Sequence, residues 1–344
     1  MTAQIATAGA GQFALGLGLT NECNLTCAFC YRDPARTDRL TLDQVQRVLA
    51  RLPVRSVNLG TGENGMHPEF PAMLRFLRGQ EVKLTITSNG HSIAVLDDDA
   101  VRGFAEVEFS LDYPTRAEQD AQRGAGNWDL IRAQAARCRR LGVGVTIIAV
   151  MMRANAMRLA DIADVAAQFD APLRINVYQA VQSDAFALTF EEFWAGFAAL
   201  FARTDVIAIG EPLVRAMAGL PPRQGGCGVA TVRVTPRATV LPCVYWPGGG
   251  APLDLLLDRG AGIVDTPPFT AARTLPPACA GCAFRPACGG GCAGRRVLSG
   301  APDAPDPYCP VMRGEDRRLS IRLAPRRDLA KLDSACTTIV MARG

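Results

Sequence analysis

The chain has 344 residues, of which 49% are hydrophobic and 20% charged, and its formal net charge is +4. This ordinary globular composition excludes a disordered, collagen-like or coiled-coil protein. The small net charge, without a Lys/Arg-rich run, indicates no nucleic-acid partner, and no apolar run reaches the ~18 residues of a membrane span. Because the first basic residue is Arg32, the N-terminus lacks the charged start of a signal peptide, and we expect a cytoplasmic protein without a membrane partner.

Between residues 13 and 180, short apolar runs alternate with amphipathic stretches. The expected strands are 13–20, 55–59, 82–88, 106–112, 143–151 and 173–178. The expected helices are 41–52, which opens with a capping box from Thr41 to Gln44, and 68–77, 128–141, 159–169 and 189–203. This alternation predicts an α/β domain with a parallel sheet. In such domains the chemistry lies on loops at the carboxyl ends of the strands.

The chain contains twelve cysteines. Without a signal peptide, this number argues against a disulfide framework and for metal sites. Three of them, Cys23, Cys27 and Cys30, directly follow the first expected strand. Three thiolates on one loop can hold three irons of a [4Fe–4S] cluster and leave the fourth iron open. Zinc is the alternative, although structural zinc usually takes four ligands.

Residues 221–310 are rich in proline, glycine and cysteine, and we expect only a hairpin at 229–240 and a short helix at 252–260. Such a segment buries little apolar core, so metal is expected to stabilise it. Its cysteines are Cys227, Cys243, Cys279, Cys282, Cys288, Cys292 and Cys309. The close pair Cys279 and Cys282 also fits zinc, which stays the alternative for this segment.

The cysteine triplet, with Phe29 before its third member, resembles the signature of radical S-adenosylmethionine (SAM) enzymes. Segments 61–63, 87–90 and 110–112, each after a later expected strand, resemble the SAM-binding segments of that family. The resemblance implies a partial (β/α)6 TIM-like barrel, with a SAM-binding cluster on the three cysteines. It also implies SAM contacts by Phe29, Gly62, Glu63, Ser88, Asn89, Ser110, Asp112 and Arg123. The chemistry agrees, because an amino-acid zwitterion needs a carboxylate near its ammonium and an arginine near its carboxylate.

The seven later cysteines resemble the SPASM extension of radical SAM peptide-modifying enzymes, with Ala238 at a position where that extension normally has glycine. The resemblance implies a small Cys-rich iron–sulfur domain with two auxiliary [4Fe–4S] clusters, and so three clusters in all. Its distal cluster takes Cys279, Cys282, Cys288 and Cys309, and its proximal cluster takes Cys227, Cys243 and Cys292. Some relatives have a further proximal ligand where this chain has Pro221. We therefore expect an open or non-cysteine site on the proximal cluster.

The expected organisation is an N-terminal tail (1–12), a radical SAM partial barrel (13–205), a linker (206–225), a SPASM domain (226–322) and a C-terminal tail (323–344).

Several remaining residues carry weaker signals. Cys138 lies in mid-helix and is expected in the core, whereas Cys336 is expected to be structural or idle, with a late cluster ligand as the alternative. The two histidines, His67 and His91, are expected to be structural. The remaining candidates, each able to face a substrate cavity or simply to pack, are Tyr178, Glu211 and Tyr245. No catalytic acid or base is assigned.

The resemblance implies an enzyme that reductively cleaves SAM to a 5′-deoxyadenosyl radical, which abstracts a hydrogen atom from a ribosomally made peptide. A flavodoxin- or ferredoxin-type protein is the expected electron donor. Because only about a dozen residues precede the first expected strand, a separate peptide-recognition protein is a further expected partner. One alternative is a radical SAM dehydrogenase or epimerase of an aminosugar, nucleoside or cofactor intermediate. Another is a non-catalytic iron–sulfur or zinc scaffold.

Overall fold

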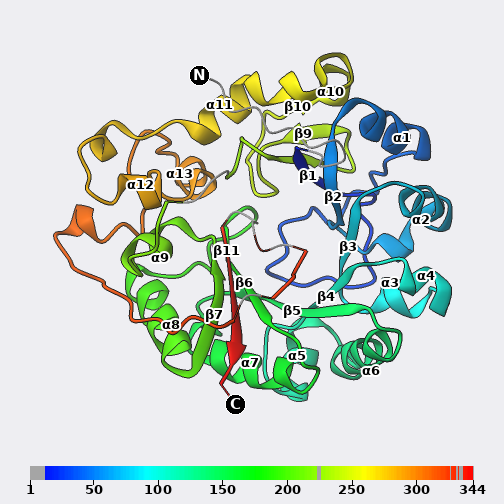
Figure 1. Ribbon diagram of the computed structural model, residues 1–344, viewed down its shortest axis with the longest axis horizontal. Helices are drawn as coiled ribbons and strands as arrows, with labels where there is room; N and C mark the ends of the chain where they lie inside the picture. The colour runs from blue at the N-terminus through cyan, green and yellow to red at the C-terminus, as the bar shows by residue number, and fades with distance from the viewer. Residues whose placement is uncertain (1–11, 223–225, 326, 331, 333–335, 344) are drawn as a thin grey trace.

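The computed structural model describes residues 12–222, 226–325, 327–330, 332 and 336–343. In this part of the chain, eleven strands form one curved sheet in the order β10-β9-β8-β1-β2-β3-β4-β5-β6-β11-β7 (Figure 1). The strands are β1 Phe13–Leu17, β2 Val54–Leu59, β3 Lys83–Ser88, β4 Glu106–Ser110, β5 Gly144–Met151, β6 Leu173–Val177, β7 Thr204–Ile209, β8 Thr231–Val234, β9 Thr239–Leu241, β10 Ala251–Pro252 and β11 Thr337–Ala342.

Strands β1 to β6 pair in parallel, in chain order, so the predicted partial (β/α)6 barrel is confirmed. The helices that follow them lie along the outer side of the curved sheet (Figure 1). They are α1 Leu42–Arg51, α2 Phe70–Arg78, α3 His91–Ala94, α4 Asp98–Arg102, α5 Arg116–Arg123, α6 Asn127–Arg140, α7 Leu159–Ala167 and α8 Phe190–Arg203, and a further helix, α9 Pro212–Met217, follows β7. Helix α1 begins with the predicted capping box, in which Thr41 and Gln44 satisfy each other's backbone N–H groups.

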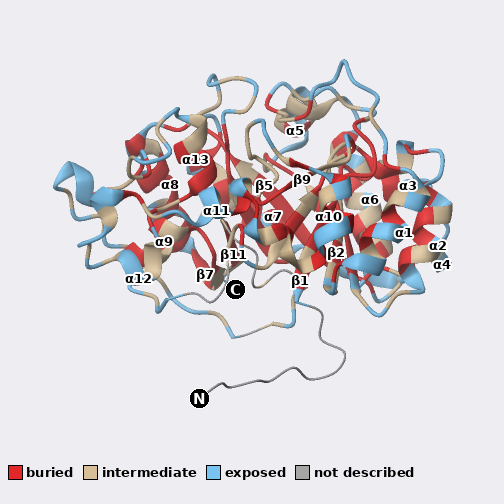
Figure 2. Cartoon of the chain, turned by 90° about the horizontal axis from the view of Figure 1, so that it is seen from above, coloured by how far each residue is buried: buried red, intermediate tan, exposed pale blue. Residues whose placement is uncertain are grey.

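The core lies between the sheet and these helices, and Figure 2 shows buried residues on the central strands and exposed ones on the peripheral helices and loops. Helix α8 contributes Phe193, Phe197 and Phe201, each at most 2% exposed. Their spacing of four residues places all three on one face of the helix. Within the described residues, no helix is long and apolar enough to cross a membrane.

Two segments differ from the sequence-based expectation. The predicted linker, 206–225, contains most of β7 and all of α9, and the predicted C-terminal tail contains β11. Strand β11 pairs antiparallel with both β6 and β7 and so joins them. Its run Thr337–Val340 consists of β-branched residues, which favour strands. Because about 130 residues of chain separate β11 from β7 and about 160 separate it from β6, local periodicity does not reveal the pairing.

The cysteine-rich segment continues the barrel sheet before it becomes irregular. Strand β8 pairs in parallel with β1, and β9 pairs antiparallel with β8, as the predicted hairpin requires. The short helices of this segment are α10 Leu253–Arg259, α11 Pro267–Arg273, α12 Arg285–Cys288 and α13 Ala293–Leu298. The segment is therefore attached to the barrel at β1 as well as through β7.

Candidate functional site

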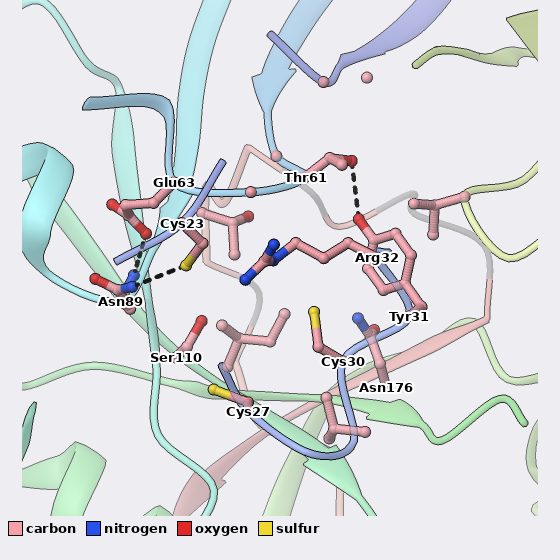
Figure 3. Close-up of a pocket in the computed structure, with 18 of the residues that line it drawn as sticks. Cys23, Cys27, Cys30, Tyr31, Arg32, Thr61, Glu63, Asn89, Ser110 and Asn176 are labelled. Atoms are coloured by element: carbon pink, nitrogen blue, oxygen red, sulfur yellow. Dashed lines mark hydrogen bonds between the residues drawn. The ribbon is translucent and has the colours of Figure 1, made fainter. Parts of the chain in front are cut away.

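A cavity of about 240 Å³ lies at the carboxyl ends of β1 to β6 (Figure 3). The thiols of Cys23, Cys27 and Cys30 line it, from the loop that follows β1. The predicted SAM contacts that line the same cavity are Phe29, Gly62, Glu63, Ser88, Asn89, Ser110 and Arg123. The topology thus brings together side chains from four separate strand-end segments, as expected for an α/β domain.

The cysteine loop is held by its own hydrogen bonds and by one buried arginine. The backbone N–H of Cys30 donates to the carbonyl of Cys27 (3.0 Å). Arg32, only 7% exposed, donates to the carbonyl oxygens of Asn21 (3.1 Å) and Leu25 (2.6 Å). It was not among the sequence-predicted site residues, because an arginine within a cysteine loop has no distinctive spacing. The guanidinium therefore fixes the path of the loop.

The chemistry of the three thiols fits an iron–sulfur cluster. All three are free and partly exposed toward the cavity. Burial raises the pKa of the Cys23 thiol to about 11, so without metal this thiol keeps its proton at neutral pH. A metal must displace that proton, which couples binding to pH. Three thiols from one loop can bind three different irons, as the sequence predicts.

Glu63 lies in the wall of this cavity and is 1% exposed. Its carboxylate accepts hydrogen bonds from the hydroxyl of Ser88 (2.5 Å) and from the backbone N–H groups of Asn89 (2.9 Å) and Ser92 (2.7 Å). These bonds tie the turn after β2 to the turn after β3. Gly62 is required there, since its φ is +63° and a Cβ would lie 2.4 Å from the carbonyl oxygen of Thr20.

Arg123 reaches the cavity from the end of α5 and is oriented by Asp112. Its Nε donates to Asp112 (2.7 Å), and its guanidinium lies 5.2 Å from the centre of the Phe29 ring. Burial disfavours the charge on Arg123, but Asp112 and Cys27 outweigh that effect and raise its pKa. The other oxygen of Asp112 accepts from the backbone N–H of Val150 (2.8 Å). Asp112 is fully buried and is not among the residues that line the cavity, so the structure places it behind Arg123.

Of the three residues suggested for a substrate cavity, Tyr178 and Tyr245 line the main cavity. Glu211 does not, and instead forms a buried ion pair with Arg295. Arg233, which sequence reasoning missed, also lines the cavity, and within the described part of the chain no acidic side chain pairs with it. Arg233 could not be found from the sequence, because the alternation of polar and apolar residues in a short strand does not reveal which face of the strand lines a cavity.

Two of the remaining weak candidates, His67 and Cys138, occupy buried positions that agree with a structural role. His67 is 3% exposed, and its ring bonds the carbonyl of Leu40 and the backbone N–H of Glu69. Cys138 is fully buried in the core. His91 begins α3 and is only partly buried.

The four predicted distal thiols line one small cavity beside α9. They are Cys279, Cys282, Cys288 and Cys309. Next to them, the fully buried Asp306 accepts from the backbone N–H of Cys292 (2.7 Å) and pairs with Arg295 (2.7 Å). Asp306 therefore connects the distal group to the proximal one.

The predicted proximal thiols of Cys227, Cys243 and Cys292 also come together, and the thiol of Cys336 lies beside them. Within the described ranges, no three His, Cys, Asp or Glu side chains are arranged around one metal ion. Thiols that hold a polynuclear cluster bind different irons, so they need not converge on a single point.

Residues 17–166 match the sequence profile of the radical SAM superfamily, and this range contains the cysteine loop, Glu63, Asn89 and Arg123. This part of the chain is a radical SAM domain. Two solved structures resemble the protein in fold. Streptococcus suis SuiB has a TM-score of 0.64 and 17% identity over 87% of this chain and 77% of that one. The structure of anSMEcpe with bound AdoMet has a TM-score of 0.66 and 16% identity over 88% of this chain and 91% of that one.

Among curated proteins, the mycofactocin maturase MftC of Mycobacterium ulcerans is 28% identical over 341 residues, covering 90% of each chain. Because the aligned region is more than twice as long as the matched radical SAM range, the similarity continues into the cysteine-rich segment.

Proposed function

We propose that this radical SAM enzyme modifies a peptide. The observation that carries the proposal is the convergence, in one cavity, of the three-thiol loop with Glu63 and Arg123. Support for a peptide substrate comes from the similarity to the mycofactocin maturase, which extends over 90% of both chains. When bound, the cluster and SAM supply a one-electron cleavage of the sulfonium C–S bond, and the resulting 5′-deoxyadenosyl radical removes a hydrogen atom from the substrate.

The residues of this cavity have separate roles in the proposal. Cys23, Cys27 and Cys30 hold the SAM-binding cluster. Arg123 binds the SAM carboxylate through charge-assisted hydrogen bonds, and the buried charge of Glu63 favours the SAM ammonium. The remaining proposed SAM contacts, which form the wall around these groups, are Phe29, Gly62, Ser88, Asn89 and Ser110. Asp112 acts through Arg123 rather than on SAM.

The part of the cavity that is lined by Tyr178 and Arg233 is proposed to receive the substrate. The ring of Tyr178 packs against Phe186, which also packs against Phe29, with ring centres 5.9 and 6.2 Å apart. Such a wall excludes water, which protects a reactive radical from side reactions. Arg233, which has no acidic partner among the described residues, adds a positive charge that is suited to a carboxylate of the substrate. Gly16 leaves room for it, since a Cβ there would lie 1.9 Å from Nη1 of Arg233.

The cysteine-rich segment is proposed to hold two further [4Fe–4S] clusters, one on each group of thiols, giving three in all. Accordingly, residues 13–205 would carry the SAM chemistry and 226–322 the auxiliary clusters. A flavodoxin- or ferredoxin-type donor supplies electrons in this proposal, and a separate protein presents the peptide. The many free thiols support a reducing compartment, and we place the reaction in the cytoplasm.

The experiment is an anaerobic assay with reductant and SAM, in the presence and absence of a synthetic peptide encoded beside the gene. We expect 5′-deoxyadenosine and a change in the peptide's mass with the wild-type enzyme and with Cys138→Ala, and neither with Cys27→Ala. Formation of 5′-deoxyadenosine without any change in peptide mass would contradict the peptide assignment. Failure of iron-replete protein to form 5′-deoxyadenosine would contradict SAM cleavage itself.

A further inference from the structure

The thiol of Cys336 belongs to a group of four thiols. Its sulfur lies 4.0 Å from that of Cys227 and 3.9 Å from that of Cys292. The Cys227 thiol in turn contacts that of Cys243. The sulfurs of Cys243 and Cys292 also lie close to the same position. A Cβ atom added to Gly294 would be 3.9 Å from the sulfur of Cys243 and 3.8 Å from that of Cys292. Cys227 and Cys336 are 109 residues apart in the chain, so the tertiary structure alone brings them together.

The backbone at Cys336 is held in an unusual conformation by its neighbours. Its φ is +56°, a left-handed value that is unfavourable for a non-glycine residue. The N–H of Cys336 donates to the carbonyl of Gly210 (3.1 Å), and the N–H of Gly210 donates to the carbonyl of Thr337 (2.6 Å). Such conformations persist where the surroundings enforce them, and they concentrate at functional positions.

The same end of β7 also fixes the partner thiol. Glu211 follows Gly210 and pairs with Arg295, three residues beyond Cys292. Both Cys336 and Cys292 are thus positioned from one short segment, residues 210–211. In addition, Cys227, Cys243 and Cys336 line a common cavity of about 130 Å³, so the thiols face open space rather than packed core.

We propose that Cys336 is the fourth thiolate ligand of the proximal auxiliary cluster, together with Cys227, Cys243 and Cys292. This inference rests on the proposed function, because it assumes that the cluster is present. It replaces the expectation of an open or non-cysteine site. For Cys336 it favours the alternative of a late cluster ligand over a structural or idle role. Four thiolates occupy every iron of a [4Fe–4S] cluster, so a substrate has no iron of this cluster to bind. The remaining role for the proximal cluster is then electron transfer.

The test compares the whole enzyme with Cys336→Ala and, as a matched control, Cys138→Ala, which removes a buried cysteine in the α6 core. After anaerobic reconstitution, iron, zinc and acid-labile sulfide are counted, and the reduced proteins are examined by electron paramagnetic resonance. We expect Cys336→Ala either to lose one cluster, with its spectrum and up to four irons per chain, or to show a shifted spectrum for that cluster. The control should match wild type. Iron, sulfide and spectra identical to wild type in Cys336→Ala would overturn the proposal.

Alkylation of wild-type protein provides a second measurement that needs no variant. With mass-spectrometric readout, Cys336 is expected to react in the metal-free protein and to be protected after reconstitution, in parallel with Cys227 and Cys292. Reaction of Cys336 in reconstituted protein whose Cys227 and Cys292 are protected would overturn the proposal. Failure of the proposed function looks different, because wild-type protein would then show no auxiliary cluster and no protection at any of these cysteines.

Discussion

Glu211 and Arg295 form an ion pair of 2.6 Å in which both side chains are almost fully buried. Glu211 follows β7 of the barrel, whereas Arg295 lies on α13 of the cysteine-rich segment and also pairs with Asp306 (2.7 Å). The pair therefore connects the part that binds SAM to the part that carries the later thiols.

Removal of Glu211 is expected to weaken this connection strongly. Glu211→Ala leaves a buried arginine with one of its two carboxylates, and breaking a buried pair costs about 3–5 kcal/mol. We expect a lower apparent midpoint of thermal unfolding and loss of auxiliary-cluster iron. Glu191→Ala is the matched control, since its pair with Arg317 is exposed and is worth about 1 kcal/mol or less. Equal effects of the two substitutions would contradict the connecting role of Glu211.

The cysteine loop is expected to depend on Arg32. Arg32→Met removes donors to two backbone carbonyls, of which the buried one at Asn21 is left unsatisfied at a cost of about 1–3 kcal/mol and the partly buried one at Leu25 costs less. The SAM-binding cluster should be lost preferentially, together with 5′-deoxyadenosine formation, while iron of the auxiliary clusters stays. Arg36→Met, whose side chain pairs with Asp38 at the surface of the same loop, should retain activity. A fully active Arg32→Met enzyme would show that the loop does not need this residue.

Asp112 and Arg123 are expected to affect SAM binding to different degrees. Arg123→Gln removes a charged donor, worth about 1.5–3 kcal/mol, and should weaken SAM binding by about 10- to 150-fold. Asp112→Asn leaves the charge on Arg123 but loosens its orientation, so its effect should be smaller. Binding is measured by titrating SAM into reconstituted protein. Arg116→Gln, on the exposed face of α5, serves as the control, and a larger effect of Asp112→Asn than of Arg123→Gln would reverse the assignment.

The hairpin before Cys243 is expected to be improved by glycine. Ala238 has a φ of +53°, which is strained for alanine and natural for glycine. Ala238→Gly should therefore raise stability by about 1 kcal/mol. The same change at Ala202, an exposed position within α8, should lower stability by about 1 kcal/mol. Apparent thermal midpoints of the anaerobic proteins test this opposite sign, and a shared sign would refute it.

His67 is expected to make stability sensitive to mild acid. Burial lowers the pKa of its ring, which is neutral while it accepts a bond from the N–H of Glu69. At a pH below the unfolded value of about 6.5, the unfolded chain binds a proton that the folded chain does not, so stability falls with pH. His67→Gln should flatten the dependence of the unfolding midpoint between about pH 7.5 and 5.5, whereas His91→Gln should preserve it. An unchanged dependence in His67→Gln would place the titrating group elsewhere.

Features that depend on local patterns could be predicted from the amino-acid sequence. The spacing of the three cysteines after β1 indicates a cluster, because ligands on one loop recur at fixed intervals. The alternation of apolar runs and amphipathic stretches predicts β1 to β6, because residues on one strand face also recur at a fixed interval. Glu63, Asn89 and Ser110, which the family resemblance had indicated, lie after β2, after β3 and at the end of β4, and they meet at one edge of the sheet because the carboxyl ends of parallel strands lie together.

The meeting of segments that are distant in the chain is visible only in the folded protein. Strand β11 lies between β6 and β7, and Asp112 lies behind Arg123. The sulfur of Cys336 lies 4.0 Å from that of Cys227. These relationships arise from strand pairing and packing over about 100 residues of chain or more, or from the direction in which a side chain points. Long-range pairing and side-chain direction produce no periodic pattern in the sequence, because long-range contacts depend on complementary surfaces of the whole fold.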